Sequence, residues 1–260
     1  MGGVEWEAMS AGGREGLAAL RHRLEALERE GRHPRAVLPF GVPAIDGALP
    51  GGGLALGALH EVAGDEGDGE DGAGAAAFLA GILARLRPPR PVLWCLPAAD
   101  LHGPGLAACG LAPERLILAQ PREDQVLWAM EEGLRSSVLA AVVGEVEALP
   151  AAASRRLQLA AETSGVTAFA LRRWHRAEAG AERSAPNTAV TRWRVKALPG
   201  ALWAGEPGVG RPLWRIELWR CRGGVPASWE VEASNATGHV ALAAALVDRP
   251  AAAFPWAAAG

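Results

Sequence analysis

The sequence predicts an α/β fold in which a mostly parallel sheet is flanked by helices. Apolar runs of strand length alternate with segments of helical periodicity, an order that favours a sheet with helices on both faces. The runs are continuous rather than alternating, which is typical of strands covered on both sides. The predicted strands are Ala58 to Ala63, Pro91 to Leu96, a segment within Leu111 to Gln120, Val138 to Val143 and Val166 to Leu171. The predicted helices are Ala73 to Leu86, Asp124 to Arg135 and Pro150 to Thr163.

The pattern changes beyond Arg172. A polar stretch with glycine and proline, residues 176–188, predicts a loop. Three short alternating segments follow, at Thr191 to Ala197, Leu213 to Cys221 and Ser228 to Glu232. Because Gly and Pro turns join them, we expect antiparallel strands added at the C-terminal end of the sheet.

The chain divides into three predicted parts. Residues 1–36 form a tail with an amphipathic helix, residues 37–248 the core, and residues 249–260 a flexible tail. The helix, from Arg14 to Glu30, has one narrow apolar stripe. Its members are Leu17, Leu20, Leu24 and Leu27. The stripe is a candidate docking surface for another protein, although packing against its own domain explains it as well and is the commoner case.

Composition limits where the protein works. The sequence opens with no basic segment leading into an apolar one, and it holds no run of 18 apolar residues, so we expect a cytoplasmic protein that does not span a membrane. The net charge of −3 hides an asymmetry. Residues 1–150 hold 12 basic and 21 acidic residues, whereas residues 151–260 hold 14 and 8. The basic part could meet nucleic acid or an acidic partner, or it could complement the acidic part.

A glycine-rich loop between the first strand and the first helix has the position of a phosphate-binding loop without its chemistry. A P-loop needs G-x-x-x-x-G-K-[ST], in which the lysine meets phosphates and the hydroxyl holds Mg²⁺. Here Gly64 and Gly69 supply the glycines, but Glu70 replaces the lysine and Asp71 the hydroxyl residue. One charge pair at ~4 Å is worth about 4 kcal/mol, so its reversal costs roughly 8 kcal/mol. A micromolar ligand has about that much binding energy in total, so we expect no nucleotide cofactor.

Residues resembling two known groups of proteins surround this loop. The approach LPFGVPAIDGALPGGGLALGALHEVAG is similar to the entry into the RecA-type recombinase core. Four further segments resemble ImuA, the inducible-mutagenesis A family of bacteria: VVGEV at 142–146, SRRLQLAAE at 154–162, TRWRV at 191–195 and WRIELWRCRGG at 214–224. The resemblance extends from about Leu38 to Glu232 and implies a RecA-like core with a degenerate P-loop.

The RecA-type pattern also places carboxylates that this sequence lacks. An Asp that positions Mg²⁺ ends the third strand in that pattern, whereas here the run ends in Gly144 and Glu145. A glutamate that activates water follows the second strand there, and Asp100 is the only carboxylate near that position. A lone aspartate without a phosphate site is a weak catalytic candidate. The sequence therefore predicts a protein that is not an enzyme and holds no metal.

By resemblance, the protein would act in the SOS response to DNA damage, in error-prone translesion synthesis. The implied partners are an inactive, ImuB-like relative of Y-family polymerases and an error-prone replicative-type DNA polymerase. The RecA filament and single-stranded DNA are further candidate partners. Two other readings stay open: an ATPase of the RecA or KaiC kind with an unorthodox loop, and a SulA-like cell-division inhibitor.

Two groups of basic residues are candidate contacts for DNA or a partner protein. The first follows the fourth strand, at the sheet edge where open α/β folds place ligands, and comprises Arg172, Arg173 and Arg176. The second alternates along one strand and comprises Arg192, Arg194 and Lys196. Their spacing of roughly 6.6 Å could follow a nucleic-acid backbone. A loop that neutralises the acidic half, and a solvated strand face, account for the same residues.

Overall fold

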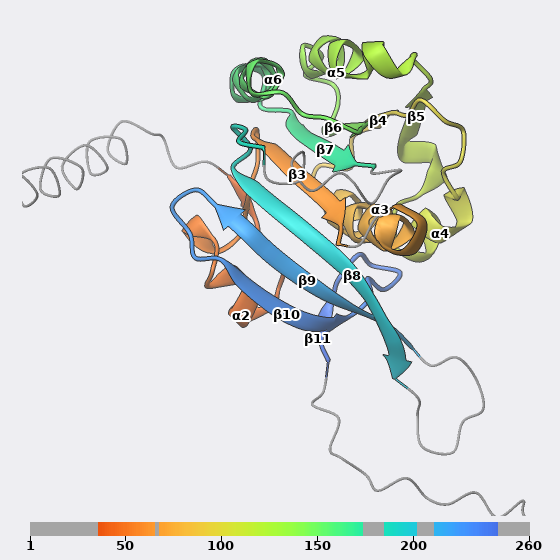
Figure 1. Cartoon of the computed structure of the whole chain (residues 1–260), viewed down its shortest axis with the longest axis vertical. Helices are drawn as coiled ribbons and strands as arrows, with labels where there is room; N and C mark the ends of the chain where they lie inside the picture. The colour runs from red at the N-terminus through yellow and green to blue at the C-terminus, as the bar shows by residue number, and fades with distance from the viewer. Residues whose placement is uncertain (1–35, 66–67, 174–184, 202–210, 244–260) are drawn as a thin grey trace, which may run out of the picture. The chain divides into compact units, whose positions relative to one another are not determined.

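The computed structural model describes residues 36–65, 68–173, 185–201 and 211–243 (Figure 1). The described residues from Val37 onward belong to one compact unit. The boundary drawn at residue 36 and the tail 249–260 remain predictions, because residues 1–35 and 244–260 lie outside the described part. The leucine stripe Leu17, Leu20, Leu24 and Leu27 lies there too. No described helix is long and apolar enough to cross a bilayer.

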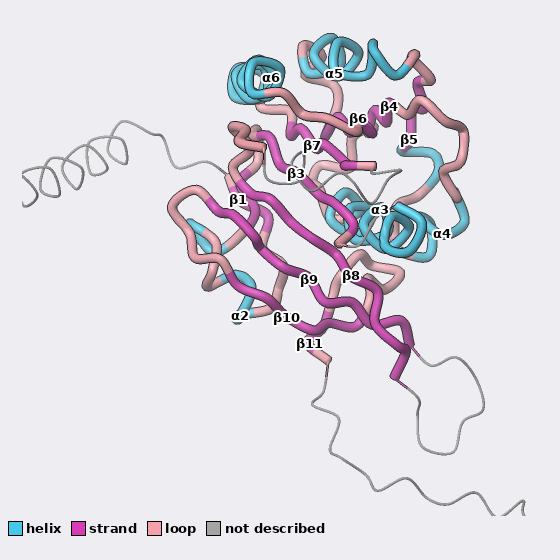
Figure 2. The backbone as a smooth tube through the Cα atoms, in the orientation of Figure 1, coloured by secondary structure: helices cyan, strands magenta, loops and turns pink. Residues whose placement is uncertain are grey.

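A nine-stranded sheet organises the unit, in the order β11-β10-β9-β8-β3-β7-β6-β4-β5 (Figure 2). Six neighbouring strands, from β8 to β5, are parallel, and β9, β10 and β11 extend the sheet in antiparallel pairing. Their bounds are β3 Leu59–Gly64, β4 Val92–Cys95, β5 Leu116–Ala119, β6 Ala141–Val146, β7 Thr167–Arg172, β8 Thr191–Ala201, β9 Arg211–Cys221, β10 Ala227–Glu232 and β11 Ala241–Leu242. The predicted α/β fold with C-terminal antiparallel strands is confirmed, with one refinement: β8 pairs parallel to β3 and antiparallel to β9.

Helices cover both faces of the parallel strands. On one face lie α3 (Asp68–Ala84) and α4 (Gly103–Ala108), and on the other α5 (Val126–Leu134) and α6 (Ala151–Ser164). Smaller elements are the pair β1 (Val37–Leu38) and β2 (Leu54–Ala55), the helix α2 (Pro43–Asp46), and the 3-10 turns η1 (Pro50–Gly52), η2 (Pro113–Arg115) and η3 (Glu123–Gln125). The helix α6 ends at Gly165, whose φ of 76° is the left-handed conformation that glycine adopts readily.

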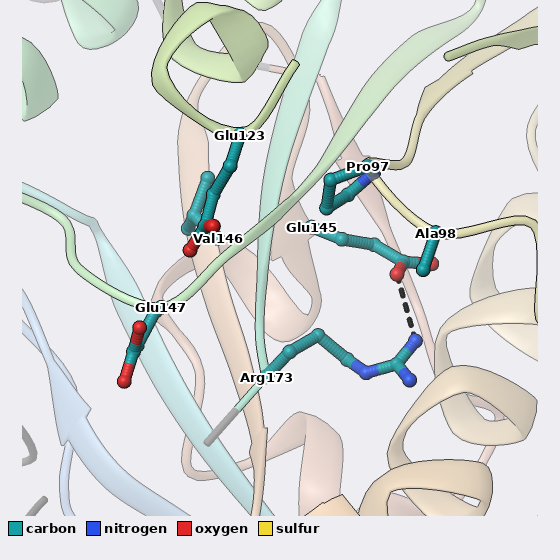
Figure 3. A pocket seen from close by; sticks show the side chains of 7 residues that line it. All are labelled: Pro97, Ala98, Glu123, Glu145, Val146, Glu147 and Arg173. Atoms are coloured by element: carbon teal, nitrogen blue, oxygen red, sulfur yellow. Dashed lines mark hydrogen bonds and ion pairs between the residues drawn. The ribbon is translucent and has the colours of Figure 1, made fainter. Parts of the chain in front are cut away.

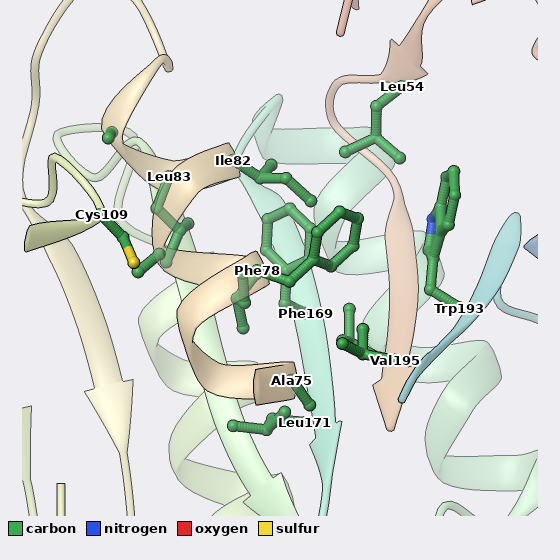
Figure 4. Packing of buried hydrophobic residues seen from close by; sticks show 14 of the residues in the cluster. Leu54, Ala75, Phe78, Ile82, Leu83, Cys109, Phe169, Leu171, Trp193 and Val195 are labelled. Atoms are coloured by element: carbon green, nitrogen blue, oxygen red, sulfur yellow. The ribbon is translucent and has the colours of Figure 1, made fainter. Parts of the chain in front are cut away.

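Two apolar cores follow from the alternation of side chains along each strand. Phe78 of α3 packs against Trp193 of β8, with ring centroids 5.7 Å apart (Figure 4). Both rings also contact the ring of Phe40. On the opposite face, Met130 of α5 and Leu157 of α6 pack on the strands. Since the strands are covered on both sides, their apolar runs are continuous, as the sequence indicated.

The third predicted strand was placed three residues too early. Val138 belongs to the turn before β6 and is 66% exposed, and the strand runs from Ala141 to Val146. An apolar run alone does not locate the first ladder hydrogen bond, so strand ends are uncertain in sequence. Consequently Gly144 and Glu145 lie inside the strand rather than after it.

Candidate functional site

The carboxyl ends of β4, β6 and β7 form the candidate site. The chain leaves β4 toward α4 on one face of the sheet and leaves β6 toward α6 on the other, and such a switch point is where open α/β sheets bind ligands. A cavity of about 340 Å³ lies there (Figure 3). Its lining residues are Pro97, Ala98, Glu123, Glu145, Val146, Glu147 and Arg173. With three carboxylates to one guanidinium, the cavity wall repels phosphate more than it attracts it.

Arg173 joins two carboxylates across this site. Its Nη1 lies 2.7 Å from Glu145 Oε2 and its Nη2 lies 2.6 Å from Asp100 Oδ2. Trp94 donates its indole N–H to the other Glu145 oxygen at 2.8 Å. Glu145 is 2% exposed, Arg173 18% and Asp100 48%. We call these three charged residues the edge cluster. Both carboxylates that the sequence placed near a metal or water site are thus ion-paired within the protein.

The loop after β3 confirms the order strand, loop, helix. The strand ends at Gly64 and α3 begins at Asp68, so Gly69 and Glu70 fall in the first turn of the helix. The Glu70 side chain lies outside the described residues. Asp71 is 2% exposed, and its Oδ1 accepts a hydrogen bond from the Ala197 backbone N–H at 2.7 Å. Asp71 therefore ties α3 to β8 from inside the fold.

An aspartate at position 144, as in the RecA-type pattern, would require the flexible side chain of Met130 to move. A Cβ built at Gly144 would lie 2.1 Å from Met130 Sδ, closer than real Cβ contacts come. The side chain of Met130 occupies that space, so an aspartate at 144 would have to displace it. Among the described residues, no group of His, Cys, Asp or Glu is arranged to hold a metal ion.

Arg172 and Arg192 do not reach the surface, and their prediction as DNA or partner contacts is wrong. Arg172 is the last residue of β7 and 1% exposed, and Arg192 on β8 is 3% exposed. Both meet Glu61 of the intervening strand β3, with Arg192 Nη2 2.9 Å and Arg172 Nη1 3.7 Å from Glu61 Oε1. Asn187 donates to the second Glu61 oxygen. These four residues form an interior cluster that belongs to the core.

The remaining basic candidates have different settings. Arg173 belongs to the edge cluster, and Arg176 lies outside the described residues. Arg194 and Lys196 are half-buried on β8. The guanidinium of Arg194 stacks over Trp219 of β9, with its carbon 4.1 Å from the ring centroid, and Arg192 lies 4.4 Å from the same ring. The alternation of β8 alone places no aromatic residue on its basic face, and Trp219 of β9 supplies one.

Trp219 was missed because register cannot be derived from the alternation of one strand. A bulge shifts the pairing of β8 with β9 between Arg192 and Trp193, so Arg192 pairs with Arg220 and Trp193 with Leu218. Glu61 and Glu145 did carry a signal. Each is a carboxylate inside an apolar run, and a buried strand can hold one only beside a cationic or hydrogen-bonding partner.

The fold and the site together define an open α/β protein in which ion pairs occupy charged groups at the carboxyl ends of the strands. No protein-family model matches the chain. Protein ImuA of Caulobacter vibrioides, found in two strains, is 40% identical over 219 residues, which cover 82% of this chain and 89% of the relative. The chain belongs to the ImuA family. Among solved structures, SulA from Pseudomonas aeruginosa shows a weak likeness, with a TM-score of 0.38 and 26% identity over 44% of this chain and 96% of SulA.

Proposed function

We propose that this chain is a non-catalytic accessory protein of damage-inducible mutagenesis, which acts in the cytoplasm through contacts with other proteins. Membership of the ImuA family supports the part in inducible mutagenesis. The proposed process is error-prone translesion synthesis within the SOS response. A RecA-like origin of the core is part of this proposal, and the strand, loop and helix at β3 and α3 support it.

The observation that carries the non-catalytic part is the edge cluster. An ATPase of the resembled kind needs a cation for the phosphates and free carboxylates for Mg²⁺ and water. Here Glu145 and Asp100 are paired with Arg173, Asp71 bonds the backbone of Ala197, and Met130 fills the space beside Gly144. To bind Mg²⁺-ATP, the protein would have to break contacts that its fold already makes.

The proposed partners are an inactive, ImuB-like relative of Y-family polymerases and an error-prone replicative-type DNA polymerase. The RecA filament and single-stranded DNA are further proposed contacts, for which two half-buried basic residues of β8, Arg194 stacked over Trp219 and Lys196, offer the chemistry. An affinity-tagged chain, purified from cells after DNA damage, tests this proposal. We expect both polymerase-like proteins to co-purify with it, and their absence at native expression levels would contradict the proposal.

The same cells provide the functional test. Deletion of the gene should abolish damage-induced mutation while leaving division of undamaged cells normal, and the wild-type chain should restore it. A chain with Glu70→Gln should restore it equally, since the proposal assigns no chemistry to this loop. Restoration that depends on ATP turnover would favour the RecA- or KaiC-like ATPase instead. Filamentation on overexpression, with the division machinery bound, would favour a SulA-like inhibitor.

A further inference from the structure

The strand β5 leaves one edge of the sheet open. It is the last strand in the order and pairs only with β4 among the described residues (Figure 1). The Leu96 N–H donates to the Ala119 carbonyl, so the backbone groups of Ala119 and Ile117 face β4. By alternation, the N–H and C=O of Leu118 face outward, where another strand could pair with them.

The side chains of β5 are unusual for an unprotected edge. Ile117 is 49% exposed and Leu118 57%, and they project to opposite faces of the sheet. Natural proteins commonly protect such an edge with lysine, proline, a bulge or a very short strand; LILA has no lysine, proline or bulge, so its length of four residues is the protection left. A short, open and apolar edge is the kind that an extended segment of another chain covers.

Three arginines gather at the start of this strand. Arg87 and Arg115 both donate to the Ala84 carbonyl, at 2.8 and 3.1 Å, and Arg115 also donates to the Arg90 carbonyl. Arg90 donates to the Ser137 carbonyl at 3.0 Å. Their partners are neutral carbonyls, and within the described ranges none of the three forms an ion pair with a carboxylate. The positive charge at this end of β5 is therefore available to an acidic ligand.

We propose that β5 is a docking edge for an extended segment of a partner protein, one with alternating apolar residues and a cluster of carboxylates at one end. The added strand would pair with Leu118, cover Ile117 and Leu118, and place its acidic end beside Arg87, Arg90 and Arg115. Charge complementarity favours this occupant, because the three arginines attract a cluster of carboxylates, whereas a second copy paired in parallel would bring like arginines together.

This proposal deepens the proposed function and rests on it for the existence of a protein partner. Its test uses purified protein and defined peptides, so its failure would leave the co-purification and mutagenesis tests standing. The probes are two fluorescent peptides of alternating valine and threonine, one with three aspartates at the N-terminus and one with them at the C-terminus. A third peptide carries lysines in place of the aspartates.

We expect one aspartate peptide to bind, in the orientation that brings its acidic end to Arg115, and the lysine peptide to bind at least about tenfold more weakly. Ile117→Glu with Leu118→Glu should weaken binding by about tenfold or more. Arg87→Glu with Arg90→Glu should weaken it several-fold and flatten its salt dependence. Val225→Glu is the matched control, since Val225 is 66% exposed in the turn between β9 and β10, and it should change nothing.

Backbone pairing is tested without changing the protein. Two versions of the peptide are N-methylated, one at the odd-numbered amides and one at the even-numbered amides. Only one of these two sets would face β5, so one version should lose binding and the other should keep it. Equal binding of the aspartate and lysine peptides, no binding at millimolar concentration, or equal tolerance of both methylation phases would overturn the proposal. A dimer seen in sedimentation and dissociated by Ile117→Glu with Leu118→Glu would also overturn it. Single-stranded DNA that displaces the peptide and depends on the same arginines would do so too.

Discussion

The interior cluster and the edge cluster are built from the same chemistry in different surroundings. In the interior cluster, one carboxylate, Glu61, holds two arginines that are almost fully buried. In the edge cluster, one arginine, Arg173, holds two carboxylates, of which Asp100 is half exposed. The first spans β7, β3 and β8 in the middle of the sheet, and the second joins the ends of strands where a ligand would bind.

Burial decides what each cluster contributes. Charges in the interior cannot recover water when a partner is removed, so the loss of Glu61 would leave two arginines in the core. The edge cluster is partly solvated, and its loss should cost less stability while opening the site. The interior cluster thus maintains the fold, and the edge cluster occupies the carboxyl ends of β4, β6 and β7, where open α/β sheets bind ligands.

The largest expected effect is on the interior cluster. Glu61→Leu should lower the free energy of unfolding by about 3–5 kcal/mol, because Arg172 and Arg192 stay buried without their carboxylate. Urea denaturation followed by tryptophan fluorescence measures it. The control is Glu230→Leu, which removes the exposed pair with Arg215 and should cost less than about 1 kcal/mol. Similar values for both variants would show that the interior pairs are not what holds β3 between its neighbours.

The edge cluster should give an intermediate effect. Arg173→Leu leaves Glu145 buried, but Trp94 still donates to it, so we expect a loss of about 1–3 kcal/mol. A double-mutant cycle with Asp100→Ala measures the coupling energy of the exposed pair between Arg173 and Asp100, which should stay under about 1 kcal/mol. A loss as large as that of Glu61→Leu would remove the distinction between the two clusters.

Buried thiols provide a kinetic check on the same cores. Burial raises the pKa of the Cys95 thiol to about 11 and also raises the pKa of Cys109. Both thiols therefore stay protonated at pH 8 and should react with a disulfide reagent far more slowly than the same thiols in urea. Rapid labelling of Cys95 in the folded protein would mean that the sheet opens more easily than its packing indicates.

The smallest expected effect concerns DNA. Two of the six predicted phosphate contacts, Arg172 and Arg192, are buried, so at most four remain. The slope of log affinity against log salt on single strands should therefore be no steeper than about −3. Arg194→Ala with Lys196→Ala should reduce the slope by about 1.4 and leave stability within about 1 kcal/mol. Fluorescence anisotropy at several salt concentrations measures it. An unchanged slope would exclude the β8 face as the contact.

Local patterns in the sequence carried most of the fold. The apolar runs from Ala58 to Leu171 predicted the parallel strands, and the change of pattern after Arg172 predicted the antiparallel ones. The order of the strands in the sheet could not be predicted from these patterns, because β4 follows β3 in the chain but lies three positions away in the sheet. For that reason the pairing of Glu61 with Arg172 and Arg192, and of Arg173 with Asp100, appeared only in three dimensions.

Departures from a known motif can be found in one sequence, whereas the contacts that occupy the site cannot. Glu70 and Gly144 are visible in one sequence as departures from the resembled RecA-type pattern, because that pattern has fixed chemistry. What fills the site instead depends on which side chains meet, and Met130 and Arg173 come from other elements. Arg172 and Arg192 were predicted to be surface contacts because a sequence shows which residues are charged but not which are buried.

Calorimetric titration of the purified chain with ATP and Mg²⁺ tests the central claim most directly. We predict no measurable binding up to millimolar ATP and no phosphate release. Glu70→Lys should behave the same, since Asp71 still bonds Ala197, Met130 still fills the space beside Gly144, and Arg173 still pairs with Glu145. Micromolar affinity with Mg²⁺-dependent turnover in the wild-type chain would contradict the account, because it would require a site that these contacts already occupy.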